Sequence, residues 1–313
     1  MSKVIAIGPY SDRDAAALAT EFQALALPDL TALADLSEDQ RRGVTAAAFM
    51  GHEAFDGATM DLLPGLKGIA NFGVGYDAID VAAATRRGIR VSNTPNVLND
   101  DVADLAVAMW IAQARDFEPA MRNARNGDWG RGVKLPLARK ASGRKVGVLG
   151  MGRIGREIAD RLAAFKTEIH YQSRRRKDAP ADWTYHADPV ELARAVDDLI
   201  VAVVGGPETE GFVSAEVIAA LGPDGVIVNI SRGSVIDEQA LIAALQGDTI
   251  RGAALDVFRG EPQIDPRLLE LSNLLPLPHI GSATVETRAA MGQLQRANLR
   301  AMLDGRAPET PVN

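Results

Sequence analysis

Three glycines, Gly150, Gly152 and Gly155, follow one another at G-x-G-x-x-G spacing and could bind the phosphates of a dinucleotide. A short apolar run precedes them, and the apolar residues after them recur at helical spacing. In such a strand–turn–helix unit, the first glycine permits a tight turn and the second lets the backbone approach a pyrophosphate. The third glycine lets the helix pack close to the strand. The helix N-terminus adds free N–H groups and the positive end of its dipole, so this pattern predicts a dinucleotide site.

The next expected strand, residues 167–172, ends where dinucleotide-binding proteins read the ribose of the cofactor. An acidic residue there would bind the ribose hydroxyls of NAD, but this chain has Ser173, Arg174 and Arg175. Guanidinium groups suit a phosphate because their planar fork makes paired, charge-assisted hydrogen bonds. A solvated basic loop is the alternative interpretation. The position of the cluster favours NADP(H), with NAD(H) as the weaker alternative.

Three polar residues, Arg232, Asp256 and His279, lie at or just beyond the ends of expected strands, and Glu261 follows Asp256 closely. Open α/β sheets bind their ligands at this edge. Hydride transfer from a nicotinamide to a 2-oxo acid requires groups that hold the carboxylate, polarise the ketone and protonate its oxygen. Arginine can do the first two, and a histidine oriented by a carboxylate can do the third. Each residue alone could be an ordinary surface or loop residue, but together they predict this chemistry.

Length, charge and composition limit the classes of protein. A chain of 313 residues is comfortable for two domains, and its net charge of −7 argues against a general nucleic-acid or anionic-membrane binder. The absence of cysteine excludes disulfides, thiolate catalysis and cysteine zinc sites. The four histidines form no H-x-x-x-H pair, so we expect no metal. We also expect no signal peptide and no membrane span, and therefore a cytoplasmic location.

Alternating strands and helices predict parallel α/β sheets. Strands are expected at residues 4–7, 45–50, 68–72, 88–92, 146–149, 167–172, 199–204, 225–230, 251–257 and 274–277. Besides the helix after the glycines, helices are expected at residues 12–25, 60–66, 100–114, 214–221, 237–246 and 284–304. Ser214 and Asp237 are the expected caps of two of them. Residues up to about 97 should form a small domain without a phosphate loop, to which the last helix returns.

Two segments have less regular patterns. Gly73 and Gly75 flank Val74 where a strand ends, and amide groups exposed there could bind a carboxylate, although a plain glycine turn is the simpler interpretation. Residues 115–142 have no clear period. We interpret them as a dimer arm because Trp129 is costly to leave exposed, with a surface loop as the alternative.

The chain resembles the D-isomer-specific 2-hydroxyacid dehydrogenases over nearly its whole length. The matching segments are residues 72–77, 91–97, 147–156, 229–233, 255–258 with 261–262, and 278–282. Within that family, residues 99–104 and 173–175 make it most similar to the NADPH-preferring glyoxylate, hydroxypyruvate and hydroxyphenylpyruvate reductases. Formate is an unlikely substrate, because Pro278 stands where the formate dehydrogenases of the family carry glutamine. Arg259 replaces a common acidic residue, with no predicted consequence.

The resemblance implies a fold of two Rossmann-like parallel-sheet domains. A nucleotide-binding domain of residues 99–284 would be inserted in a discontinuous flavodoxin-like substrate domain made of residues 1–98 and 285–313. The resemblance also implies a homodimer built through the cofactor domains, and no C-terminal regulatory domain.

The same resemblance assigns roles to individual residues. It implies Arg232, Glu261 and His279 as the catalytic set, and it implies substrate binding by Arg232, His279 and the backbone amides of Val74 and Gly75. The implied cofactor-binding residues are Gly150, Gly152, Arg153, Ile154, Gly155, Ser173, Arg174, Arg175, Ile230 and Asp256. Of these, Asp256 would contact the nicotinamide amide.

The sequence thus predicts NADPH-dependent reduction of glyoxylate or hydroxypyruvate to the 2-hydroxy acid, with the D configuration where a stereocentre forms. Two alternatives are kept. One is an NAD-dependent dehydrogenase of another D-2-hydroxy acid, and the other is a non-enzymatic nucleotide-sensing corepressor of the same fold.

Overall fold

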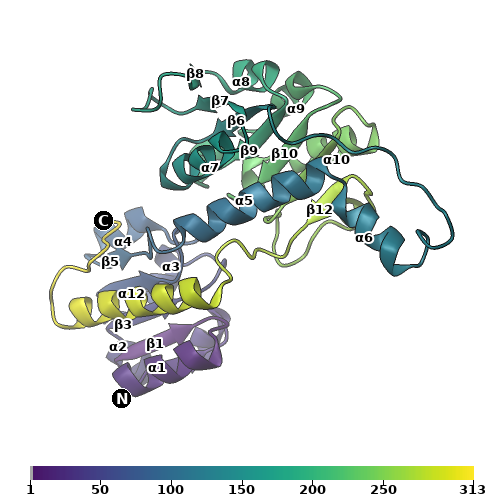
Figure 1. Cartoon of the computed structure of the whole chain (residues 1–313). Coiled ribbons are helices and arrows are strands. Elements are labelled where there is room, and N and C mark those ends of the chain that lie inside the picture. Colours follow the sequence, from purple (N-terminus) through teal and green to yellow (C-terminus); the bar gives the residue numbers. More distant parts are fainter. Residues whose placement is uncertain (1–2) are drawn as a thin grey trace. The chain divides into compact units, whose positions relative to one another are not determined.

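The computed structural model describes residues 3–313, which fold into two compact α/β units (Figure 1). The first unit comprises the chain up to Leu98 together with Ala283–Asn313, and the second comprises Asn99–Ser282. Each unit contains one parallel sheet, which confirms the predicted α/β class. Within residues 3–313, no helix combines the length and apolar character that a membrane span requires.

The first unit has five parallel strands in the order β2-β1-β3-β4-β5. They are β1 (Val4–Ile7), β2 (Leu25–Leu27), β3 (Ala46–Phe49), β4 (Gly68–Asn71) and β5 (Arg90–Ser92). This is the flavodoxin-like strand order, as predicted. Strands β1, β3 and β4 are fully buried, which explains their continuous apolar sequences.

Helices cover both faces of this sheet. They are α1 (Asp12–Phe22), α2 (Glu38–Gly43), α3 (Gly57–Asp61), α4 (Val81–Arg86) and α12 (Val285–Leu303), with the 3-10 helix η1 (Thr31–Asp35). On one face, Leu18 of α1 and Leu299 of α12 pack against Ala48 of β3. On the other face, Met60 and Ala84 pack with Ile69 of β4. The carboxyl-terminal segment therefore completes the core of the first unit.

Two predicted helices of the first unit have wrong bounds. The helix expected at 12–25 ends at Phe22, because Gln23 adopts a left-handed conformation with φ 52°. The Gln23 N–H donates to the carbonyl oxygen of Ala19 and so caps the helix. Leu25–Leu27 then pairs with β1 as strand β2, which the apolar helical spacing concealed. The helix expected at 60–66 is instead α3, which begins earlier because Asp56 caps it.

The second unit has seven parallel strands in the order β12-β11-β10-β9-β6-β7-β8. They are β6 (Lys145–Leu149), β7 (Glu168–Gln172), β8 (Thr184–His186), β9 (Asp198–Val201), β10 (Val226–Asn229), β11 (Gly252–Leu255) and β12 (Leu274–Pro276). The run from β8 to β11 has the strand order of dinucleotide-binding folds. The strand order reverses between β6 and β9, so the carboxyl ends of these two strands mark the expected ligand crevice.

Helices flank this sheet as well. They are α5 (Asn99–Ala114), α6 (Phe117–Arg125), α7 (Arg153–Ala163), α8 (Pro189–Ala195), α9 (Ala215–Leu221), α10 (Glu238–Gln246) and α11 (Pro266–Leu269), with the 3-10 helices η2 (Pro207–Thr209) and η3 (Gly233–Val235). Leu192, Val217 and Leu241 of α8, α9 and α10 are buried in one core cluster. The predicted caps Ser214 and Asp237 are confirmed, since each side chain accepts a backbone N–H of the first turn.

The segment 115–142 is more regular than its sequence suggested, because it contains α6. Asp116, directly before this helix, accepts hydrogen bonds from Arg251 at 2.9 and 3.1 Å. Beyond α6 the chain forms turns at residues 126–132 and then lacks helix and strand up to residue 140. Apolar side chains face solvent there, with Trp129 78% exposed and Leu137 97% exposed. The other large exposed apolar residues of this segment are Phe117, Met121, Val133 and Leu135.

A buried polar cluster joins α5 to the sheet of the second unit. The Asp198 carboxylate, 1% exposed at the start of β9, accepts bonds from Trp110 Nε1 at 2.8 Å and from Arg144 at 2.6 and 2.9 Å. Burial raises the pKa of Asp198, whereas the bonds from Arg144 and Trp110 oppose this rise. These contacts fix the helix that precedes the glycine motif relative to the central strands.

Candidate active site

The glycine motif forms the turn between β6 and α7, and its three members have different environments. Gly150 has φ 103°, and a Cβ there would come within 2.7 Å of the backbone of Ala202 and Val203. A Cβ on Gly155 would lie 1.9 Å from the carbonyl oxygen of Gly150, so only glycine lets α7 approach the turn. A Cβ on Gly152 would meet nothing within 4 Å. The protein itself therefore leaves open the space beside Gly152, as a cradle for a pyrophosphate requires.

The first turn of α7 completes this cradle. Gly152 is the N-cap of α7 and makes no side-chain cap bond, and Arg153 and Ile154 are the first two residues of the helix. Arg153 is exposed and Ile154 is half-buried. The helix thus presents N–H groups and a positive dipole end, with a cation beside them, which are the features that bind phosphate.

The loop after β7 contains the residues predicted to select the cofactor. The Ser173 hydroxyl is buried and donates to the carbonyl oxygen of Arg175 at 2.6 Å, so it shapes the turn. Arg174 and Arg175 are exposed. Strand β8 anchors this turn, because the Tyr185 hydroxyl donates a hydrogen bond to the Ser173 carbonyl at 3.2 Å. Two exposed guanidinium groups thus project from an anchored turn.

A histidine pair links β8 to β7 beside this turn. His170 Nδ1 and His186 Nε2 are 2.9 Å apart with stacked rings, and His170 Nε2 lies 3.0 Å from Glu168 Oε1. Burial and, secondarily, the charge of His170 lower the pKa of His186, although Glu191 opposes them. A histidine with a lowered folded-state pKa binds fewer protons when folded than when unfolded. Stability is therefore lost as pH falls below the ordinary value of about 6.5.

We therefore expect the melting temperature of the wild type to fall more between pH 7.5 and pH 5.5 than that of the His186→Gln variant. Thermal unfolding followed by circular dichroism at both pH values measures this difference. Equal pH dependence in the two proteins would contradict the assigned direction.

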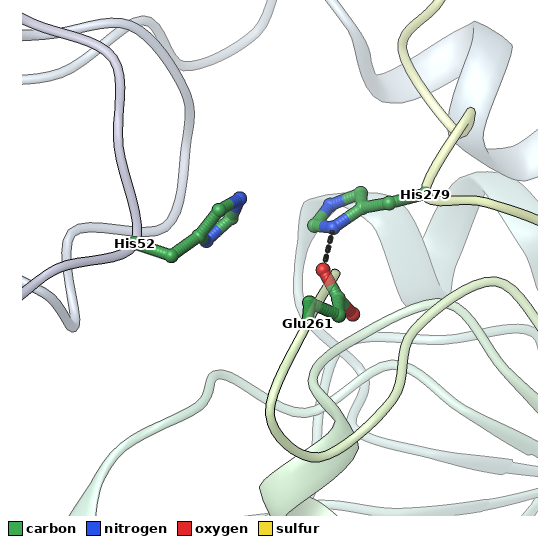
Figure 2. Close-up of side chains that lie close together, drawn as sticks. All are labelled: His52, Glu261 and His279. Atoms are coloured by element: carbon green, nitrogen blue, oxygen red, sulfur yellow. Dashed lines mark hydrogen bonds and ion pairs between the residues drawn. The ribbon is translucent and has the colours of Figure 1, made fainter. Parts of the chain in front are cut away.

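A histidine–carboxylate pair lies beyond the ends of β11 and β12. His279 Nδ1 is 2.6 Å from Glu261 Oε2, as the dashed line in Figure 2 shows. The other Glu261 oxygen accepts the backbone N–H of Phe258 at 2.6 Å, so the carboxylate is held from both sides. With Nδ1 engaged by Glu261, Nε2 is the ring nitrogen suited to exchange a proton with a substrate. The structure therefore brings together two of the three predicted catalytic residues.

Asp256 positions the loop that carries His279. Its carboxylate is 1% exposed and accepts the backbone N–H groups of Ile280 and Gly281 at 2.7 and 2.8 Å. Burial raises the pKa of Asp256, and these two bonds oppose the rise. His279 has φ 54°, an uncommon conformation for a residue with a side chain. The two bonds to Asp256 fix the peptides that directly follow this strained residue.

Arg232 follows β10, in a turn that Asn229 organises. The Asn229 side chain accepts from the Ser231 N–H and hydroxyl at 3.0 and 2.9 Å and donates to the Arg232 carbonyl at 3.0 Å. The aliphatic stem of Arg232 packs over Gly205, where a Cβ would come within 2.5 Å of it. Ile230 lies in the same turn and is 9% exposed. Since β10, β11 and β12 are adjacent and parallel, Arg232, Asp256 and His279 extend one edge of the sheet.

Val74 and Gly75 belong to the first unit, in the loop after β4. The loop carbonyls are engaged: Asn71 donates to those of Gly73 and Gly75 at 3.2 and 2.8 Å, and Asn93 donates to that of Val74 at 2.8 Å. Within residues 3–313, the N–H groups of residues 73–75 donate to no protein acceptor. The loop thus has its acceptors satisfied and its donors available, as an anion-binding loop requires.

Sequence reasoning overlooked the residues that shape the candidate loops of each unit. In the first unit Asn71 and Asn93 shape the loop of residues 73–75. In the second unit Asn229 shapes the Arg232 turn, and Asp256, predicted only as a cofactor contact, fixes the His279 loop. An asparagine at the end of a strand and before a glycine or serine turn is the signal that could have indicated two of them. Arg259, unexplained from sequence, forms an ion pair with Glu210 at 2.7 Å.

A dinucleotide-binding sheet whose carboxyl edge carries an arginine and a histidine–carboxylate pair defines the class of nicotinamide-dependent dehydrogenases. Comparison with known proteins identifies the family. The family model described as "D-isomer specific 2-hydroxyacid dehydrogenase, NAD binding domain" matches residues 107–281. This chain belongs to the D-isomer specific 2-hydroxyacid dehydrogenases, so the predicted family is confirmed.

Several characterised proteins are similar over most of the chain. The hydroxyphenylpyruvate reductase of Plectranthus scutellarioides is 42% identical over 87% of both chains. Glyoxylate/hydroxypyruvate reductase A of Arabidopsis thaliana is 42% identical over 88% of both chains. The crystal structure of an NADPH-dependent glyoxylate/hydroxypyruvate reductase from Sinorhizobium meliloti, in complex with NADP and malonate, matches with a TM-score of 0.93 and 41% identity. That match covers 100% of this chain and 97% of the other.

Proposed function

We propose that this protein is an NADPH-dependent reductase of a small 2-oxo acid, glyoxylate or hydroxypyruvate, and that it forms the D-2-hydroxy acid where the product has a stereocentre. The His279–Glu261 pair at 2.6 Å carries the proposal, because it is a proton donor oriented at the ligand-binding edge of a dinucleotide fold. The names of similar proteins, glyoxylate/hydroxypyruvate reductase among them, support this choice of substrate.

We propose the following roles for the residues of the second unit. When bound, the nicotinamide supplies the hydride. Arg232 binds the substrate carboxylate and polarises the ketone, because its planar fork can donate two hydrogen bonds. His279 gives a proton from Nε2 to the ketone oxygen, and Glu261 stabilises the imidazolium and keeps the ring oriented. Asp256 keeps His279 in place through the amides that follow it and, as a further proposal, contacts the nicotinamide amide.

The residues around the glycine motif fit the cofactor. We propose that Gly150, Gly152, Arg153, Ile154 and Gly155 hold the pyrophosphate, because the turn leaves open space beside Gly152 and places a helix N-terminus there. We further propose that Ile230, which is buried in the turn after β10, lines the nicotinamide side of the same edge. We propose that Ser173, Arg174 and Arg175 hold the 2′-phosphate, since the anchored turn projects both guanidinium groups.

The assignment of Arg174 and Arg175 makes a specific prediction. In the double variant Arg174→Gln/Arg175→Gln, we expect kcat/KM for NADPH to fall about 10- to 100-fold, because charge-assisted bonds to the 2′-phosphate are lost. The value for NADH should change little. Initial-rate kinetics with both cofactors measure this, and Arg194→Gln, which removes an exposed charge on α8, is the control. A wild-type preference for NADH, or an unchanged double variant, would contradict the assignment.

The proposed activity is tested by following NADPH oxidation at increasing concentrations of glyoxylate, hydroxypyruvate and larger 2-oxo acids. Saturable turnover of the smallest acids with NADPH supports the proposal. Turnover of only larger acids, or only with NADH, would favour an NAD-dependent dehydrogenase of another 2-hydroxy acid. Cofactor binding without turnover of any acid would favour a nucleotide-sensing protein.

We also propose a separate binding role for each unit. We propose that the first unit binds the substrate carboxylate through the Val74 and Gly75 amides, and that the second unit binds the cofactor.

A homodimer is proposed from the exposed apolar residues of the segment that includes Trp129 and Leu137, since covering them would remove apolar surface from water. The cytoplasmic location stays a prediction.

A further inference from the structure

Arg288 lies on α12, and its guanidinium lies over the ring of Phe72, 5.8 Å from the ring centre. Phe72 is buried directly after β4, and Tyr10, which follows β1, packs edge-on against it at 5.8 Å between ring centres. Both aromatic residues come after the carboxyl ends of parallel strands. Arg288 therefore lies at the edge of the first sheet where α/β proteins bind ligands.

Within residues 3–313, the charge of Arg288 has no counter-ion. Among residues 3–313, no carboxylate forms an ion pair with Arg288, whereas Arg296 and Arg300 of the same helix pair with Asp14 and Glu21. Burial lowers the pKa of Arg288, and Asp14 opposes this effect from a distance. A half-buried guanidinium without an acceptor has lost part of its hydration, and the contact with Phe72 offsets some of that loss. An anion bound beside it would supply the missing acceptor.

The loop that directly follows Phe72 offers donors to the same anion. The carbonyls of residues 73–75 accept hydrogen bonds from the side chains of Asn71 and Asn93. The Gly73 carbonyl also accepts the backbone N–H of Thr94 at 2.9 Å. The amide groups of residues 73–75 donate to no protein acceptor in the described chain. The guanidinium over Phe72 and the available amides directly after Phe72 are both donors that suit a carboxylate.

We propose that Arg288 is a substrate-binding residue whose guanidinium contacts the carboxylate of the 2-oxo acid held by the amides of residues 73–75. This assignment rests on the proposed function and assigns a cation of the first unit to the same ligand as the amides of residues 73–75. The ligand class is a small 2-oxo monocarboxylate, in which the planar carboxylate accepts from the guanidinium and the amides together.

Kinetics and binding of an unreactive analogue test the proposal. In Arg288→Gln, we expect the KM for glyoxylate to rise about 10- to 100-fold with kcat within a few-fold of the wild type, because binding is lost equally in the ground and transition states. The Kd of oxamate, a charge-matched analogue that cannot be reduced in this way, should rise by the same factor in calorimetry with NADPH present. Arg300→Gln is the matched control, since Arg300 lies over Phe22 at 5.6 Å on the same helix but pairs with Glu21.

Arg288→Lys keeps the charge and the aliphatic stem over Phe72 but not the planar fork, so it should show an intermediate rise in KM and Kd. If Arg288→Gln does not fold, the KM and the oxamate Kd of Arg288→Lys test the proposal. Wild-type KM and oxamate Kd in a folded Arg288 variant, or an equal effect of Arg300→Gln, overturn the proposal. If the wild type reduces no 2-oxo acid, the proposed function fails, and oxamate binding that depends on Arg288 still supports the anion site. Absence of oxamate binding by a wild type that reduces glyoxylate overturns the Arg288 assignment and leaves the proposed function standing.

Discussion

Replacement of His279 by alanine should lower kcat for 2-oxo acid reduction on the order of 10²–10⁴-fold. The substrate oxygen would then have to take its proton from water instead of from a ring held 2.6 Å from Glu261. Affinity for NADPH should change little, because the glycine motif and α7 follow β6, whereas His279 follows β12. Stopped-flow measurement of NADPH oxidation, with a parallel fluorescence titration of NADPH, separates the two quantities.

The chain offers a matched control in His170, which also lies 3.0 Å from a glutamate, Glu168, but has no proposed role in the chemistry. His170→Gln should keep kcat within a few-fold of the wild type. Glu261→Gln should lower kcat less than His279→Ala does, since the ring remains but loses its charged partner. Near-normal turnover in His279→Ala would remove that residue from the proposed mechanism.

The largest expected loss of stability follows from Asp198→Ala. The substitution leaves Arg144, with a side chain only 12% exposed, and the Trp110 N–H without their acceptor. Removing one partner from a buried ion pair typically costs about 3–5 kcal/mol of the free energy of unfolding. Trp110 also loses the bond that fixes α5 to β9, so the midpoint of urea unfolding should fall clearly.

An exposed pair in the same unit provides the comparison. Asp160 and Arg156 are 2.9 Å apart with side chains about half-exposed, so Asp160→Ala should change stability by about 0–1 kcal/mol. Asp198→Asn should fall between the two, because its side-chain oxygen can still accept from Trp110. Equal urea midpoints for Asp198→Ala and Asp160→Ala would show that the buried cluster contributes no more than a surface ion pair.

Local sequence signals predicted much of the fold. Continuous apolar runs identified buried strands such as β6 and β10, and polar caps identified the starts of α9 and α10. The failures were short elements. Strand β2 has only three residues, and its apolar spacing continues that of α1, so nothing local distinguishes it from another helical turn. Pairing with β1 decides its conformation.

The candidate site likewise combines features that the sequence shows with features that only the folded structure shows. The types and positions of Arg232, Glu261 and His279 are visible in the sequence, because strand ends and glycine turns have local signatures. The functions of Asp256 and Asn229 are not visible there, since each acts through hydrogen bonds whose partners are fixed only when the loops fold. Sequence likewise could not show that, in the described part of the chain, Arg288 lacks a counter-ion while Arg296 has two.

By itself, therefore, the sequence determined the family, the parallel α/β class and the chemical types at the strand ends, because these depend on residue identity and local periodicity. Tertiary structure alone decided which groups meet. The His279–Glu261 pair is separated by 18 residues, and the bond from Trp110 to Asp198 spans 88. The glycine turn is intermediate: its spacing predicted a phosphate site, but only the folded backbone shows that Gly150 and Gly155 are sterically required while Gly152 leaves open space. Such contacts depend on how the sheet brings distant loops together, and no local pattern encodes them.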